Sequence, residues 1–155
     1  MNNLTIIPSV PIWIKEDEVI FDRKLYDGLL AYINEWPGNI TCIFCRSFDN
    51  PPDFGLVEKK VKELPFEIKL ISPKSKIDLK HIKDASMLLA SGDTFDQFHL
   101  AKLCKLNNIK CVYIVENIPE TRYQIVSIET PNLIVRLRRL FYIWNGEFKR
   151  KRAFK

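Results

Sequence analysis

The tetrapeptide Ser91-Gly92-Asp93-Thr94 has the residue types of a small ligand-binding loop. It follows the apolar run 86–90 and precedes a helical pattern over 94–107. Gly92 allows a sharp turn, and Asp93 or Thr94 can cap the following helix, whose free N–H groups attract anions or hydroxyl oxygens. The four residues equally suit a plain strand–turn–helix connection without a ligand, and their spacing favours neither interpretation.

Glu116 and Lys15 are the other charged candidates for this site. Glu116 ends the apolar run 110–115, so its carboxylate is expected at the carboxyl edge of a sheet. There it can bind sugar hydroxyls or act as a general base. The alternative is a solvated loop acid, or a salt bridge from Glu116 to Arg122. Lys15 follows the apolar opening of the chain and is the weaker candidate.

Other kinds of site find no support in the sequence. Cys42 and Cys45 form a C-x-x-C inside an apolar strand, where residues three apart point to opposite faces. Redox and zinc sites need both sulfurs on one side. His81 and His99 lack neighbours at metal-ligand spacing, and the five glycines form neither a G-x-G-x-x-G pattern nor a P-loop. We therefore expect no metal and no cofactor.

The elements that would position these residues alternate along the chain. Strands are expected at 4–7, 39–45, 66–71, 86–90 and 110–115, and helices at 24–36, 56–64, 78–84, 94–107 and from Pro131 onward. This alternation favours right-handed crossovers and an α/β fold, a Rossmann-like three-layer sandwich with a mostly parallel sheet of about five strands. Ligands of such a sheet bind at the carboxyl ends of its strands, which selects loops 15–21, 91–94 and 116–120.

The positive charge of the chain is concentrated in its last 25 residues. Residues 1–130 carry 16 Lys and Arg against 18 Asp and Glu, a net charge of −2. Residues 131–155 carry eight basic residues against Glu147 alone, a net charge of +7. The basic residues are Arg136, Arg138, Arg139, Lys149, Arg150, Lys151, Arg152 and Lys155. We therefore expect a domain over 1–130 and a basic amphipathic C-terminal helix over 131–155.

One face of this C-terminal helix is predicted to be apolar. Helical spacing aligns Leu133, Leu137, Leu140, Phe141, Trp144 and Phe148. An apolar face flanked by Arg and Lys is typical of helices that lie in a membrane interface. Packing of the first half on the domain's own sheet is the alternative, whereas the cluster Lys149, Arg150, Lys151 and Arg152 is expected to be solvated and to contact an anionic surface. No segment is long and apolar enough for a transmembrane helix, and the N-terminus lacks the pattern of a signal peptide. We therefore expect a cytoplasmic protein, and the C-terminal helix would make it peripheral at the inner face of the membrane.

Several segments together resemble the N-terminal domains of bacterial family-4-type glycosyltransferases. They are Tyr26–Tyr32 with Trp36-Pro37-Gly38, then Ala90–Gln97, Val112–Glu116 and Pro119–Arg122. The resemblance extends from about Ile6 to Arg152, and the order of the segments makes it more specific than any one of them. Two features depart from the family: Lys15–Val19 lacks the glycine pair that many relatives have, and Glu116 stands where many have a histidine.

This resemblance implies one half of a two-domain (GT-B) sugar transferase. In such enzymes the N-terminal half supplies most of the acceptor site, and the C-terminal half binds the nucleotide-sugar with a pair of glutamates. We therefore expect the acceptor, a glycan or lipid-linked molecule, to contact Lys15, Gly92, Asp93, Thr94 and Glu116, and catalytic residues stay unassigned. The chain is expected to be truncated at its linker helix, or part of a split enzyme with a second glycosyltransferase domain or partner chain, and to be inactive alone.

The alternative function is a non-catalytic binding module whose basic tail contacts an anionic membrane or nucleic acid. Of these two partners nucleic acid is the less expected, because the positive charge belongs to the tail and not to the domain. Self-association is also expected, because the apolar stripe of the C-terminal helix lacks part of its cover.

Overall fold

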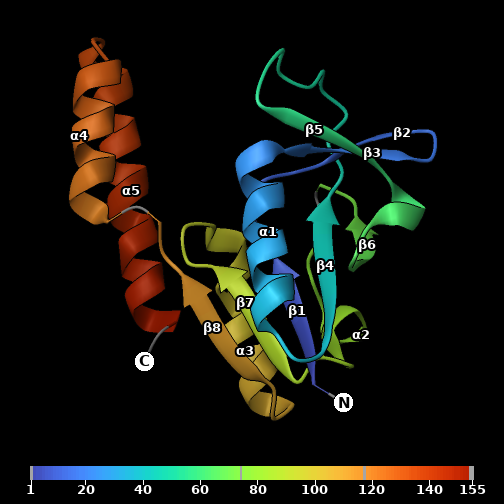
Figure 1. Ribbon diagram of the computed structural model, residues 1–155. Helices are drawn as coiled ribbons and strands as arrows, with labels where there is room; N and C mark the ends of the chain where they lie inside the picture. The colour runs from blue at the N-terminus through green and yellow to red at the C-terminus, as the bar shows by residue number, and fades with distance from the viewer. Residues whose placement is uncertain (1, 74, 117, 154–155) are drawn as a thin grey trace.

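The computed structural model describes residues 2–73, 75–116 and 118–153. Within these residues, a central sheet of five parallel strands has the order β6-β4-β1-β7-β8 (Figure 1). The strands are β1 (Asn3–Ile7), β4 (Asn39–Cys45), β6 (Glu67–Ile71), β7 (Met87–Ser91) and β8 (Lys110–Ile114). The predicted α/β, Rossmann-like fold with a mostly parallel sheet is confirmed.

Helices cover both faces of this sheet and enclose two apolar cores (Figure 1). Helix α1 (Arg23–Glu35) packs on one face, and α2 (Leu79–Ile82) with α3 (His99–Leu106) packs on the other. The carboxylate of Asp22 accepts a hydrogen bond from the Leu25 N–H at 3.0 Å and caps α1. The near-continuous apolar run of β4 follows from this double cover, because both of its faces are buried.

A second, antiparallel sheet of three strands extends the core on the α1 side. It consists of β2 (Trp13–Lys15), β3 (Glu18–Asp22) and β5 (Leu56–Lys60). The helix predicted over 56–64 is wrong. Residues 56–60 pair with β3, and only the short 3₁₀ segment η1 (Val61–Glu63) is helical. Their charged, alternating pattern is that of a strand with one face in water.

The region expected to form the helix 94–107 is divided in two. A 3₁₀ turn, η2 (Phe95–Gln97), precedes α3, which begins only at His99. Neither Asp93 nor Thr94 caps a helix with its side chain. Within the 3₁₀ turn the side chain of Gln97 is buried, and its carbonyl oxygen accepts a hydrogen bond from the Ser91 N–H at 2.9 Å.

The C-terminal region is a helical hairpin that stands at the β8 edge of the sheet (Figure 1). Helix α4 (Pro119–Glu129), which the sequence patterns did not indicate, leads away from the sheet. Helix α5 (Leu133–Ala153) packs against α4 and returns along α3. Residues on both sides of position 130 therefore belong to one hairpin. The last basic residue, Lys155, lies outside the described residues.

The ring of Phe21 is central to the core under α1 and yields a test of it. Phe21 is fully buried, and its ring lies within 6.1 Å, centroid to centroid, of the rings of Tyr26, Phe44 and Phe66. We expect Phe21→Ala to lower the free energy of unfolding by about 3–5 kcal/mol, because it leaves a cavity among these rings. Urea denaturation measures the change. The control is Phe54→Ala, which alters a side chain that is 84% exposed and should leave the midpoint unchanged.

Candidate functional site

The connections of the sheet create a crevice between β1 and β7. From β1 the chain crosses to β4 and β6 on one side, and then returns to β7 and β8 on the other. Neighbouring strands whose connections leave in opposite directions open a crevice at their carboxyl ends, which is where open parallel sheets bind ligands. A cleft of about 400 Å³ lies at this point. Its size is within the usual range for small-molecule sites.

The walls of this switch-point cleft come from three strand ends and from one face of α1. The strand ends contribute Ile6, Ile7, Pro8, Ser9, Val10, Leu89, Ala90, Ser91, Ile114 and Glu116. Asp22, Lys24, Leu25, Gly28, Leu29 and Tyr32 form the opposite wall. Asp22 is engaged in capping α1, whereas Ser9, Lys24 and Glu116 are exposed and border the opening. An apolar floor with a few polar groups at its rim is the general form of a small-ligand site.

The loop Ser91–Thr94 reaches the cleft through Ser91 and is held by its own hydrogen bonds, whereas Gly92, Asp93 and Thr94 do not line the cleft. The Ser91 hydroxyl oxygen accepts hydrogen bonds from the Asp93 N–H at 3.2 Å and from the Thr94 hydroxyl at 3.0 Å. Gly92 donates its N–H to the Ile114 carbonyl at 2.6 Å. A Cβ at this position would lie 2.7 Å from the Val115 side chain. Glycine is therefore required by the close approach of the loop to the end of β8.

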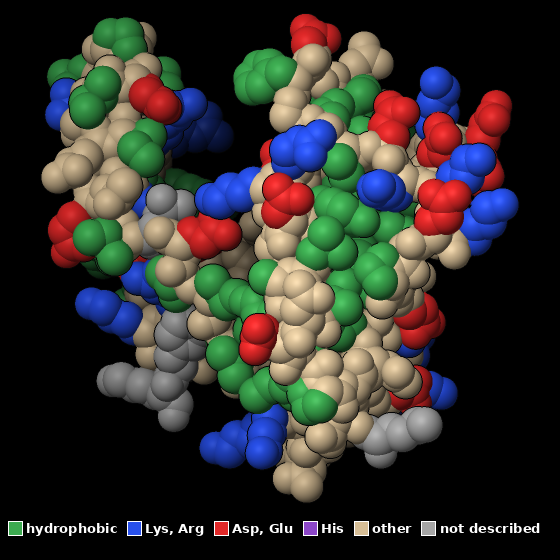
Figure 2. Space-filling model, in the orientation of Figure 1, with side chains coloured by type: hydrophobic (Ala, Val, Ile, Leu, Met, Phe, Trp, Pro, Cys, Tyr) green, Lys and Arg blue, Asp and Glu red, His purple; other side chains and the backbone are tan. Residues whose placement is uncertain are grey.

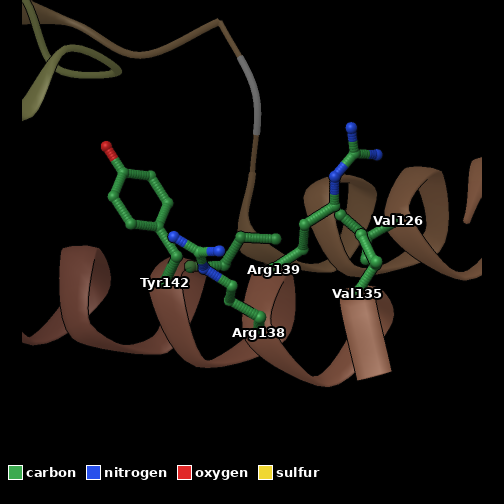
Figure 3. Close-up of a pocket in the computed structure, with 6 residues that line it drawn as sticks. Val126, Val135, Arg138, Arg139 and Tyr142 are labelled. Atoms are coloured by element: carbon green, nitrogen blue, oxygen red, sulfur yellow. The ribbon is translucent and has the colours of Figure 1, made fainter. Parts of the chain in front are cut away.

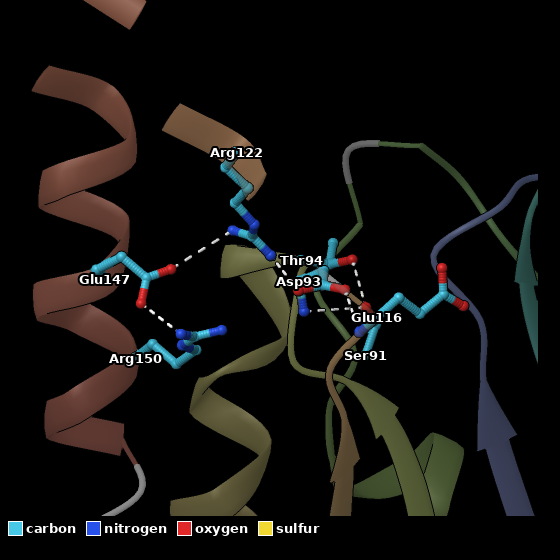
Figure 4. A network of polar contacts seen from close by, with 7 residues as sticks. All are labelled: Ser91, Asp93, Thr94, Glu116, Arg122, Glu147 and Arg150. Atoms are coloured by element: carbon cyan, nitrogen blue, oxygen red, sulfur yellow. Dashed lines mark hydrogen bonds and ion pairs between the residues drawn. The ribbon is translucent and has the colours of Figure 1, made fainter. Parts of the chain in front are cut away.

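Asp93 joins this loop to the helical hairpin through a network of buried charges (Figure 4). One carboxylate oxygen of Asp93 pairs with Arg122 of α4, and the other accepts the Glu116 N–H at 2.7 Å. Arg122 also lies 3.7 Å from a carboxylate oxygen of Glu147 in α5, and Glu147 pairs in turn with Arg150. All four side chains are at most 16% exposed. We call Asp93, Arg122, Glu147 and Arg150 the ion network.

The structure brings together four of the five residues predicted to bind an acceptor. Gly92, Asp93, Thr94 and Glu116 lie side by side at the carboxyl ends of β7 and β8. The carboxylate of Glu116 points away from Arg122 (Figure 4), so the salt bridge considered as an alternative does not form. Asp93 does not face a ligand freely, because Arg122 and the Glu116 N–H occupy both of its oxygens.

The structure places Lys15 and Arg150 differently from what the sequence predicted. Lys15 ends β2 at a tight turn onto Glu18, where Glu16 has a φ of 56°, and it does not line the cleft. The first loop reaches the cleft through Ser9 and Val10 instead. Arg150 was expected to be solvated with Lys149, Lys151 and Arg152, but its side chain is 12% exposed and pairs with Glu147. The other three are exposed.

Sequence patterns did not indicate the α1 wall of the cleft or the role of Arg122. Lys24, Gly28 and Tyr32 recur at intervals of four residues, so they line one face of α1, and that face borders the cleft. This four-residue spacing is the sequence feature that could have indicated the α1 wall. Arg122 gave no local signal, because Asp93 and Glu147 are far from it in sequence.

Cys42 and Cys45 lie on opposite faces of the sheet. Cys42 belongs to the core under α1 and Cys45 to the core on the opposite face, as predicted for residues three apart on a strand. Burial raises the pKa of the Cys42 thiol to about 12, and burial followed by the charge of Asp96 raises the pKa of Cys45. Both thiols are thus poor nucleophiles at neutral pH. No group of three or more His, Cys, Asp or Glu side chains among the described residues is arranged to hold a metal ion.

A further hollow of about 460 Å³ lies between α4 and α5 (Figure 3). Val126, Val135, Tyr142 and Ile143 form its apolar surface, with Arg138 and Arg139 at its margin. Arg139 donates a hydrogen bond to the Thr130 hydroxyl at 2.8 Å and so ties the two helices together. All of the lining residues belong to the hairpin, remote from the strand ends where ligands of this fold bind.

Comparisons with protein-family models, with curated proteins and with solved structures found no match to this chain.

The ion network predicts that a change at Arg122 loosens the hairpin. Arg122→Gln removes the cation that Asp93 and Glu147 share, and both carboxylates are poorly solvated. We expect the free energy that holds the hairpin in place to fall by about 3 kcal/mol. We expect amide hydrogens of α4 and of the second half of α5 to exchange about a hundredfold faster. Hydrogen exchange read by mass spectrometry measures this. The control is Arg138→Gln, an exposed arginine of the same hairpin. Unchanged exchange in Arg122→Gln would show that apolar packing alone holds the hairpin.

Proposed function

We propose that this chain is the acceptor-side domain of a GT-B glycosyltransferase, and that it binds a glycan or the sugar of a lipid-linked acceptor in the switch-point cleft. The observation that carries the proposal is the cleft itself. It lies at the carboxyl ends of β1, β7 and β8 and contains polar groups without a glycine-rich phosphate loop. The resemblance of the segments 26–38, 90–97 and 112–122 to family-4-type enzymes supports the same assignment.

The chemistry of the cleft supports a sugar as its ligand. A sugar ring has hydroxyl groups at its edge and C–H groups on its faces, so it needs both polar and apolar contacts. Glu116 and Ser9 offer hydrogen-bond acceptors, Lys24 offers donors, and Tyr32 with Leu25 offers an apolar wall. The Asp93 carboxylate accepts the Glu116 N–H, which holds the backbone of Glu116 at the rim of the cleft.

The donor nucleotide requires a second set of groups. The described residues contain one Rossmann-like unit, and its first strand is followed by Pro8-Ser9-Val10 and not by the glycine pair that lies near donor phosphates in many relatives. In this proposal a second domain or a partner chain therefore binds the nucleotide-sugar. The reaction served is retaining transfer of a hexosyl unit to an acceptor hydroxyl, with its catalytic residues unassigned.

Sugar binding by the cleft is tested with simple glycosides. Methyl glycosides of glucose, galactose, mannose and N-acetylglucosamine are titrated into ¹⁵N-labelled protein. We expect at least one of them to shift the amide signals of Ser9, Gly28, Ser91 and Glu116 together. Glu116→Gln should weaken that binding about fivefold or more, because a carboxylate accepts stronger hydrogen bonds than an amide.

Glu120→Gln is the matched control for this titration. It removes an exposed glutamate four residues along the chain that does not line the cleft, so the affinity should stay unchanged. Shifts confined to the hairpin, or equal weakening by both substitutions, would argue against the cleft as the sugar site.

We also expect no sugar transfer by the 155-residue chain alone. Transfer needs donor and acceptor held together within near-attack distance, and one half of a cleft cannot provide this. The assay supplies UDP-, GDP- and ADP-sugars with the glycoside that binds, and measures release of the nucleotide. Turnover that Glu116→Ala abolishes would show that this chain holds a complete active site, contrary to the proposed division.

A further inference from the structure

The outward face of α5 is apolar and uncovered. Helical spacing places five large side chains in one row, here called the α5 stripe: Leu133, Leu137, Phe141, Trp144 and Phe148. Their exposed fractions run from 51% for Phe148 to 67% for Leu133. The alternative considered for the first half of this row, packing on the domain's own sheet, does not occur, because Leu133 and Leu137 are exposed. The aromatic members support one another, because the Trp144 ring lies 5.8 Å from Phe141 and stacks on Phe148 at 6.3 Å.

The opposite face of α5 is the one that packs on the rest of the protein. Ile143, Gly146 and Glu147 are its buried residues. The ring of Phe95 lies directly against Gly146, where a Cβ would come within 1.8 Å of a ring carbon. This contact and the ion network fix the rotation of the helix about its axis. The stripe therefore stays on the outside, and the space-filling view shows apolar side chains on the surface of the hairpin (Figure 2).

The net charge of the protein lies on the same hairpin. Residues 118–153 carry eight Lys and Arg against three Glu, a net charge of +5, whereas residues 1–117 carry 15 against 16. Arg138, Lys149 and Arg152 follow the stripe along one side of the helical wheel, and all three are exposed. The guanidinium of Arg152 lies 5.1 Å above the Phe148 ring, so charge and apolar surface are in direct contact.

We propose that the α5 stripe is a membrane-binding face, which lies in the interface of an anionic lipid bilayer. An apolar row with aromatic rings and a basic border is what such an interface accommodates, with the rings among the acyl chains and the cations at the headgroups. Each basic residue near the surface adds about 1 kcal/mol of attraction. No helix among the described residues is long and apolar enough to cross a membrane, so α5 would lie along the surface.

Charge complementarity selects this occupant over two others. A second copy of the chain would bring two hairpins of charge +5 together, and their border cations would repel. A nucleic acid needs donors along its phosphates, whereas the centre of the stripe offers only apolar groups. An anionic bilayer satisfies the cations and the apolar row at once. This inference uses no residue of the switch-point cleft, so it stands or fails separately from the proposed function.

Vesicle binding with the emission of Trp144 as reporter tests the inference. Vesicles of phosphatidylglycerol and phosphatidylcholine, or of phosphatidylcholine alone, are sedimented with the protein at low and high salt. We expect binding to the anionic vesicles only, at least tenfold weaker at high salt, with a blue shift of Trp144 emission and quenching by shallow doxyl-labelled lipid. Trp144→Phe should keep the binding and lose the blue shift, which assigns the signal to that position.

Two pairs of matched variants separate the apolar and the charged contributions. Phe141→Ser with Phe148→Ser should abolish binding, whereas Phe48→Ser with Phe54→Ser, two exposed rings of the loop before β5, should not. Lys149→Glu with Arg152→Glu should also abolish it, whereas Lys60→Glu with Lys62→Glu, at the end of the second sheet, should weaken it far less. All eight positions are exposed, and circular dichroism verifies folding.

Three results would overturn the inference. One is equal binding to neutral and anionic vesicles, and another is anionic binding that survives loss of Phe141 and Phe148. The third is a concentration-dependent dimer without lipid, seen by light scattering, in which Trp144 emission is already blue-shifted. That result would assign the stripe to self-association.

Discussion

Arg122 is the residue on which the relation between the parallel sheet and the hairpin depends. Its guanidinium contacts Asp93 at the end of β7, Glu147 in α5 and the face of the Phe95 ring. Asp93 in turn holds the Glu116 N–H at the end of β8. The same cation therefore links the rim of the cleft to the hairpin. Because two acids and two arginines share the site, their charges balance, which is the condition under which buried ions are tolerated.

The parallel sheet was predictable because each of its strands coincides with a short, mostly apolar run in the sequence. β4 is buried on both sides, and its seven residues were identified with their boundaries. The second sheet was missed because β3 and β5 are rich in charged residues, and their apolar positions are covered only when α1 and β4 lie beside them. The Glu58-Lys59-Lys60 sequence suits a helix surface as well as a strand with a wet face.

The cleft was partly predictable for a topological reason. In a parallel sheet the carboxyl ends of all strands meet at one edge, so residues 91–94 and Glu116 had to come near one another. Lys15 failed the same rule, because the chain after β1 makes a hairpin of β2 and β3 before it enters α1. Which groups face the ligand depended on pairing between distant residues. Asp93 and Arg122 are 29 positions apart, and no local pattern distinguishes an aspartate that binds a ligand from one that binds an arginine.

The orientation of α5 shows how charge and shape can prevail over apolar burial. Turning Trp144 and Phe148 inward would remove their side chains from water, and burial of a large apolar side chain stabilises a fold by up to about 1.5–3 kcal/mol. That rotation would bring a bulky residue against the Phe95 ring in place of Gly146. It would also withdraw Glu147 from Arg122 and strand Arg150. Losing a partner from a buried ion pair costs about 3–5 kcal/mol, and the steric conflict adds to it. The α5 stripe is thus uncovered because of how the hairpin is anchored. Burial of the stripe would require a surface outside this chain.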